Sequence, residues 1–81
     1  MPHAYILGSG RDNGFYVGST RDLDQRLKRH TEGRIHATKN RLPLAMVYFK
    51  SFETYNEAYK YEQFIKRQKS SEYINRLIIR E

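Results

Sequence analysis

The chain has 81 residues and contains 15 lysines and arginines, nine aspartates and glutamates, and no cysteine, so its formal net charge is +6. A chain this short is expected to form one domain, residues 1–81, and the absence of cysteine excludes disulfides, thiolate metal sites and cysteine nucleophiles. The basic excess favours nucleic acid as a partner, although a basic surface that only aids solubility is the alternative.

No stretch of the sequence indicates a membrane protein. No apolar run approaches the roughly 20 residues that span a bilayer, and no basic segment followed by an apolar run begins the chain. We therefore expect a cytoplasmic protein that does not bind a membrane.

The first predicted elements are two short strands joined by a turn. Residues 3–7 and 15–18 are rich in β-branched and aromatic side chains. Asp12-Asn13-Gly14 between them favours a hairpin, because Asn and Gly tolerate positive φ. Each strand presents one tyrosine, Tyr5 and Tyr16, a pair that by itself is ordinary hairpin packing.

A short amphipathic helix is predicted next, over residues 21–31. Ser19-Thr20 supplies its N-cap and Asp22 an acid in its first turn. Two leucines form the buried stripe of this helix. Arg26 and His30 are four residues apart and therefore share one flank of the stripe, near the edge of the core.

A polar, basic loop over residues 33–43 leads to a third strand over residues 44–52, expected to be largely covered on both faces. Basic residues cluster from the first helix through this loop against a single acid. We expect the cluster to contact nucleic acid. Its candidate binding residues are Lys28, Arg29, Arg34, Lys39 and Arg41.

Thr54 and Glu57 form a capping box, so a second helix is predicted from Tyr55 to residue 67 or 69. Its apolar arc contains Tyr55, Ala58, Tyr59, Tyr61 and Ile65. Glu62 lies in the middle of that arc, where a bare carboxylate would cost several kcal/mol of desolvation. A salt bridge to Arg26 or a bound metal ion would each explain its position, and a short C-terminal helix then covers the core.

These side chains together suit phosphodiester hydrolysis, which uses a carboxylate-bound divalent cation, an arginine on the developing negative charge and a base that activates water. A hard ion such as Mg²⁺, or Mn²⁺ in its place, suits a single carboxylate because it keeps several waters.

The same residues resemble the signature of the GIY-YIG nuclease superfamily. Its two triplets are written here as Ala4-Tyr5-Ile6 and Tyr16-Val17-Gly18, followed in order by Arg26, His30 and Glu62. Ala4 replaces the first glycine and Val17 the second isoleucine, while both tyrosines match. The resemblance extends over residues 4–69 and is greatest to short bacterial proteins that consist of this domain alone.

The resemblance implies an α+β fold, with a small three-stranded antiparallel sheet flanked by helices in the order β-β-α-β-α-α. It implies that Tyr16 takes a proton from the attacking water, that Tyr5 orients water or phosphate, and that Arg26 stabilises the developing charge. It makes Glu62 the sole protein ligand of the metal ion. His30 would hydrogen-bond the phosphate or orient Tyr16.

A supporting asparagine of the family has Asn75 as its nearest counterpart. The function implied is metal-dependent cleavage of DNA, with structure-specific cutting or DNA repair as its setting and RNA as another possible substrate. Relatives with known targets usually carry an added DNA-binding domain, so a protein partner could supply specificity here. The alternative is a catalytically weak nucleic-acid-binding or adaptor module on the same scaffold.

Overall fold

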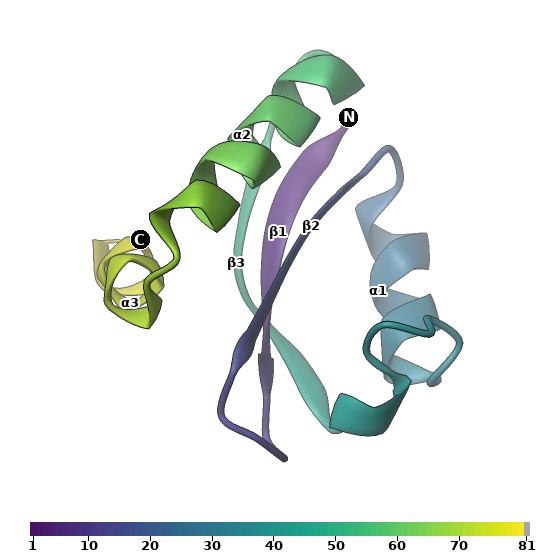
Figure 1. The fold of residues 1–81 in the computed structure, drawn as a ribbon. Coiled ribbons are helices and arrows are strands. Elements are labelled where there is room, and N and C mark those ends of the chain that lie inside the picture. Colours follow the sequence, from purple (N-terminus) through teal and green to yellow (C-terminus); the bar gives the residue numbers. More distant parts are fainter. Residues whose placement is uncertain (81) are drawn as a thin grey trace.

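The computed structural model describes the backbone of residues 1–80 and the side chains of residues 1–79. Three strands and three α-helices follow one another in the predicted order β-β-α-β-α-α, which confirms the α+β class (Figure 1). The elements are β1 (His3–Ser9), β2 (Phe15–Thr20), α1 (Leu23–Thr31), the short 3-10 helix η1 (Lys39–Arg41), β3 (Leu44–Ser51), α2 (Tyr55–Gln68) and α3 (Ser71–Arg80). No helix within this part of the chain is both long and apolar enough to cross a membrane.

The sheet is antiparallel throughout and has the order β2-β1-β3, so the first strand is central, as predicted. Tyr5 lies opposite Gly18 on β2, and its neighbour Ile6 lies opposite Val17. Residues directly opposite each other share a face of the sheet, and successive residues alternate between faces. The side chains of Tyr5 and Ile6 therefore point to opposite faces. Figure 1 shows α1 on one side of the sheet and α2 with α3 on the other.

The predicted hairpin turn is confirmed. Asn13 has a φ of 59°, and the Asp12 carboxylate accepts a hydrogen bond from the Gly14 amide. Arg41 reaches this turn from η1, with its Nε 2.8 Å from Asp12 Oδ2, and lowers the pKa of Asp12 to about 2. The turn between β1 and β2 is therefore bound to the loop that precedes β3.

The two faces of the sheet are buried by different kinds of side chain. The face under α2 and α3 carries the hydrophobic core, whose buried members are Ile6, Val17, Tyr48, Ile65 and Ile74. The face under α1 instead buries side chains that include Tyr5, Leu7, His30 and Thr38. Buried polar side chains are thus concentrated beneath α1.

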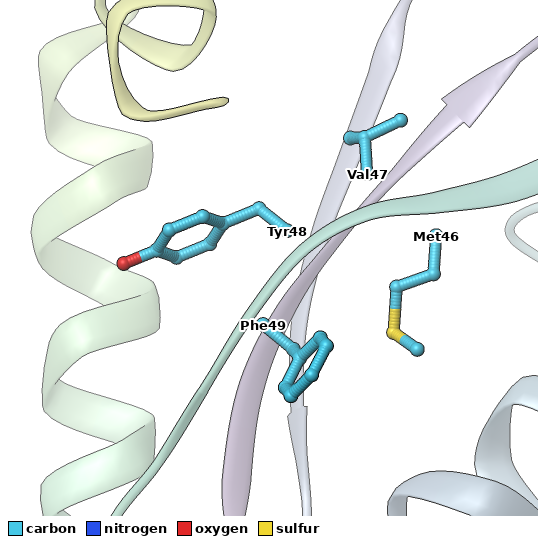
Figure 2. Close-up of a pocket in the computed structure, with 4 residues that line it drawn as sticks. All are labelled: Met46, Val47, Tyr48 and Phe49. Atoms are coloured by element: carbon cyan, nitrogen blue, oxygen red, sulfur yellow. The ribbon is translucent and has the colours of Figure 1, made fainter. Parts of the chain in front are cut away.

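The expectation that the third strand is covered on both faces is wrong. β3 is an edge strand, and Phe49 remains 55% exposed. Figure 2 shows Tyr48 pointing toward α2, whereas Met46 and Phe49 project from the other side of the strand, beside a surface hollow. A run of apolar residues cannot by itself distinguish a central strand from an edge strand, which is why the sequence misled here.

The first helix begins later than predicted, because β2 continues through Thr20 and Ser19-Thr20 is therefore strand. Asp22 is the N-cap rather than a first-turn acid, and its Oδ1 accepts from the Gln25 amide at 3.0 Å. The capping box of α2 is confirmed, and α2 ends at Gln68 with Lys69 in the left-handed region.

Candidate active site

Tyr5 is the centre of a buried hydrogen-bond network beneath α1. Its Oη lies 2.9 Å from His30 Nε2 and accepts a longer hydrogen bond from Arg26 Nε, at 3.4 Å. Burial raises the pKa of Tyr5, although the neighbouring Arg26 guanidinium opposes that rise. Tyr5 therefore stays a neutral phenol near pH 7, suited to holding its partners in place.

Gly18 makes room for the Tyr5 ring. A Cβ at Gly18 would lie 2.6 Å from both Tyr5 Cζ and Tyr5 Oη, a separation that carbon atoms do not tolerate. The last residue of the Tyr16-Val17-Gly18 triplet is thus a glycine because the tyrosine of the first triplet lies across it. The two triplets are one packing unit.

His30 is fully buried, and both of its ring nitrogens are occupied. Nε2 meets Tyr5, and Nδ1 lies 2.7 Å from Thr38 Oγ1, so one nitrogen donates and the other accepts in the neutral ring. Burial, together with the charges of Arg26 and Arg29, lowers the pKa of His30 to about 4. At neutral pH the imidazole is uncharged and its hydrogen bonds go to other side chains.

Tyr16 lies on β2, half-buried, against the same histidine. Its ring centroid is 5.1 Å from that of His30 and 6.5 Å from that of Tyr5. The pKa of Arg26 is raised, chiefly by its hydrogen bond to Tyr5, with a smaller contribution from Tyr16. The four candidates on this side of the sheet therefore form one cluster.

Glu62 lies on the other side of the sheet, on α2, and is only 8% exposed, as its place in the apolar arc predicted. A salt bridge, one of the two explanations for this position, is present, but its partner is Lys66 and not Arg26. Ser19 Oγ donates to Glu62 Oε1 at 2.5 Å, and Lys66 Nζ lies 2.6 Å from Oε2. Lys66 follows Glu62 by four residues, about one helical turn, so the two side chains lie on the same face of α2 and can pair.

The edge strand β2 connects the two groups. Gly18 and Ser19 are successive residues, so Gly18 faces Tyr5 while Ser19 faces Glu62. A polar hollow of about 300 Å³ extends around the end of β2, from α1 to the start of α2. It is lined by Ser19, Thr20, Arg21, Asp22, Gln25, Arg26 and Tyr55. The hollow thus touches both the arginine of the first group and the hydroxyl that holds Glu62.

Glu62 could act as a single protein ligand for a metal ion. Among the residues described, no three His, Cys, Asp or Glu side chains gather closely enough to form a metal cage. A buried carboxylate that already attracts one cation, Lys66, has the charge and oxygen chemistry that a hard divalent ion requires. The donor set therefore fits an ion that keeps most of its waters.

The predicted nucleic-acid-binding residues divide into two kinds. Lys28, Arg29, Arg34 and Lys39 are exposed along α1 and the loop after it, with Arg34 in a loose pair with Glu32. Arg41 is half-buried and bound to the hairpin turn, so it also has a structural role.

Asn75, the possible supporting residue, is exposed on α3. That helix lies beyond the C-terminal end of α2, on the side of the sheet away from α1 (Figure 1). Within the described residues Asn75 makes no hydrogen bond to any of the other candidates.

Sequence reasoning missed three residues that hold the candidates in place. The sequence pattern assigns Ser19 to a helix cap, although its position beside Gly18 places it on the face of Glu62. Thr38 lies in an aperiodic loop and gives no sequence signal. Lys66 is the third, and its signal lies in its spacing from Glu62, which is that of a helical ion pair.

Comparison with known proteins identifies the family. Residues 1–75 match the GIY-YIG catalytic domain. A UPF0213 protein of Bacillus velezensis is 41% identical over 77 residues, which are 89% of this chain and 77% of the relative. The UPF0213 protein YazA of Bacillus subtilis is 36% identical over 66 residues, covering 80% and 67% of the two chains, and a UPF0213 protein of Clostridium perfringens is 38% identical over 68 residues, covering 83% and 72%. No solved structure matches. The chain therefore belongs to the GIY-YIG family, whose domain implies nuclease activity.

Proposed function

We propose that the protein is a divalent-metal-dependent endonuclease that hydrolyses phosphodiester bonds in DNA. The observation that carries this proposal is the grouping of two tyrosines, an arginine and a histidine on one face of the sheet, next to β2. Ser19 of the same strand holds the buried Glu62 on the other face. Each group has a role in such a reaction, and the polar hollow around the end of β2 provides access for a phosphate.

On the α1 side, Tyr16 is the candidate base that takes a proton from water. Tyr16 is less buried than Tyr5. It contacts His30 through its ring and makes no hydroxyl hydrogen bond to that histidine. Tyr5 and His30 position this ring. Arg26 lines the polar hollow and, because its own partner Tyr5 is neutral, its positive charge is available to a phosphate.

On the α2 side, Glu62 would hold the divalent cation, with Mg²⁺ or Mn²⁺ as the candidate ions. Such an ion would neutralise charge on the phosphate and lower the pKa of a water bound to it. Ser19 fixes the carboxylate through Oε1. Lys66 neutralises Glu62 when no metal is bound, and because its side chain is 47% exposed it can turn toward solvent or toward a phosphate.

DNA is the proposed substrate because exposed cations continue from Arg26 along α1. Lys28 and Arg29, together with Arg34 beyond the helix, line a second polar hollow. A backbone that entered at the first hollow would meet these charges as it left, and such contacts carry no sequence information. Structure-specific cleavage, as in DNA repair, suits that arrangement. A protein partner could supply target specificity.

The direct experiment incubates pure protein with labelled duplex, flap, fork and single-stranded DNA and with RNA, in Mg²⁺, Mn²⁺ or chelator. Metal-dependent cleavage of at least one DNA substrate is expected. Binding without cleavage in every condition would instead support the second candidate, a nucleic-acid-binding or adaptor module. The pairing of Glu62 with Lys66 is the observation that favours that alternative, because it satisfies the carboxylate without metal.

A further inference from the structure

Two tyrosines near the start of α2 have no part in the proposed reaction. The sequence pattern places Tyr55 and Tyr59 on an apolar arc, yet Tyr59 is 45% exposed and neither residue belongs to the hydrophobic core of the described chain. Their rings stack on each other, with centroids 6.4 Å apart and planes 27° from parallel. The exposed Tyr59 therefore adjoins the half-buried Tyr55 at the protein surface.

The pair lies beside Glu62. Ser19 Oγ, which donates to Glu62, also lies 3.4 Å from Tyr55 Oη. Tyr59, Glu62 and Lys66 succeed one another at spacings of three and four residues, so they project from the same side of α2. A chain whose phosphate reached Glu62 would therefore pass close to the ring of Tyr59.

Positive charge accompanies these rings. Arg21 Cζ lies 4.5 Å from the centroid of the Tyr55 ring, in cation–π contact, and Lys66 lies two helical turns beyond Tyr59, one turn beyond Glu62. Aromatic rings beside guanidinium and ammonium groups match a nucleotide, whose base stacks while its phosphates meet the cations.

We propose that the Tyr55–Tyr59 pair is a stacking platform for an unpaired nucleobase beside the phosphate at Glu62. In a closed duplex both faces of every base are covered by its neighbours, so only a single strand, flap or frayed end can offer a free base to Tyr59. The inference rests on the proposed function for the position of the phosphate, and it assigns the substrate class as DNA with unpaired nucleotides.

The test measures binding in chelator at low salt, so that neither metal nor cleavage contributes. Two labelled single-stranded DNA oligomers of about six nucleotides are compared by anisotropy, a natural one and one that is abasic at every position and so keeps the phosphates without bases. Wild type should prefer the natural oligomer by roughly 5- to 150-fold, the range for one stacked base. Tyr59→Phe should keep the preference.

Tyr59→Ala should lose most of this preference while still binding the abasic oligomer, and Tyr59→Leu, which keeps apolar bulk without a ring, should lose it too. The matched control is Phe64→Ala, because Phe64 is an exposed aromatic on the same helix that packs instead on Tyr61 and Tyr73. That variant should behave as wild type.

The proposal is overturned if Tyr59→Ala and Tyr59→Leu keep the preference, if they weaken binding to both oligomers equally, or if Phe64→Ala has the same effect. It is also overturned if wild type binds both oligomers equally well, a result that leaves the proposed nuclease function intact. If wild type binds neither oligomer nor any DNA at low salt, the proposed function fails as well.

Discussion

The two faces of the sheet carry the two groups of the candidate active site, and they hold their charges differently. Beneath α1, Tyr5, Arg26 and His30 are joined by hydrogen bonds in a largely buried cluster that Thr38 completes. Beneath α2, Glu62 is neutralised by one half-exposed side chain, Lys66. The first group is fixed by the fold, and the second has a counterion that can be exchanged.

A ligand is therefore more able to change the Glu62 group than the α1 group. Removing a member of the α1 group leaves buried polar atoms without partners, so those residues are tied to stability as well as to chemistry. The charge at Glu62 is balanced by Lys66 and, under the proposed function, would be balanced by a metal ion instead. Four experiments separate the two behaviours.

Removing Arg26 should have the largest effect on the α1 group. Arg26→Ala should lower cleavage at saturating substrate on the order of 10²- to 10³-fold, the usual loss when one charge-stabilising donor is removed. Arg29→Ala is the matched control, since Arg29 is exposed on the same helix. It should weaken binding while leaving the saturated rate unchanged. Equal saturated rates for wild type and Arg26→Ala would remove Arg26 from the chemistry.

The buried histidine should make the α1 group sensitive to acid. The folded pKa of His30 is about 4, below its ordinary 6.5, so between these values the unfolded chain binds a proton that the folded chain does not. The stability that His30 contributes is therefore complete above pH 6.5 and falls by up to about 3 kcal/mol as the pH drops to 4.

Denaturant unfolding of wild type and His30→Gln across this range measures the effect. The variant should be less stable at pH 7, because the hydrogen bonds of the buried imidazole are disturbed. It should lose less stability on acidification, because glutamine binds no proton in this pH range. Parallel stability curves for the two proteins would show that His30 titrates normally and is not held neutral by the fold.

The exchangeable counterion predicts the smallest effect. Lys66→Met keeps the length of the side chain and removes the competing charge, so affinity for Mn²⁺ without DNA should rise by about 2- to 5-fold, matching the small free energy of a partly exposed ion pair. Calorimetry measures this affinity. Weaker Mn²⁺ binding by Lys66→Met would mean that the lysine helps to organise the metal site and does not compete for it.

Local sequence patterns predict much of this fold. They fail where the environment of a residue depends on segments that are distant in the sequence. The hairpin, the capping box of α2 and the burial of Glu62 follow from turn chemistry, capping and helical periodicity, which a single sequence displays. The exposure of β3 and of Tyr59 depends on which faces remain uncovered after assembly. No local pattern contains that information.

The candidate site shows the same division. The family motif points to two tyrosines, but the reason for Gly18 appears only when the tyrosine of one strand is seen across the backbone of the next. Thr38 reaches His30 from a loop without periodicity, so sequence gives its chemistry but not its place.

The role proposed for the buried Glu62 is to bind a cation for cleavage. Glu62→Gln tests it most directly, because the amide oxygen can still accept the Ser19 hydrogen bond while the charge is removed. Cleavage in Mg²⁺, Mg²⁺ affinity and the thermal midpoint should be measured on the same preparation. We predict a loss of cleavage on the order of 10³-fold or more, no measurable Mg²⁺ binding, and a midpoint within about 8 °C of wild type, which corresponds to about 1 kcal/mol in a domain of this size. A variant that unfolds would identify the Lys66 pair as structural, and a folded variant that cleaves at the wild-type rate would exclude Glu62 from the reaction.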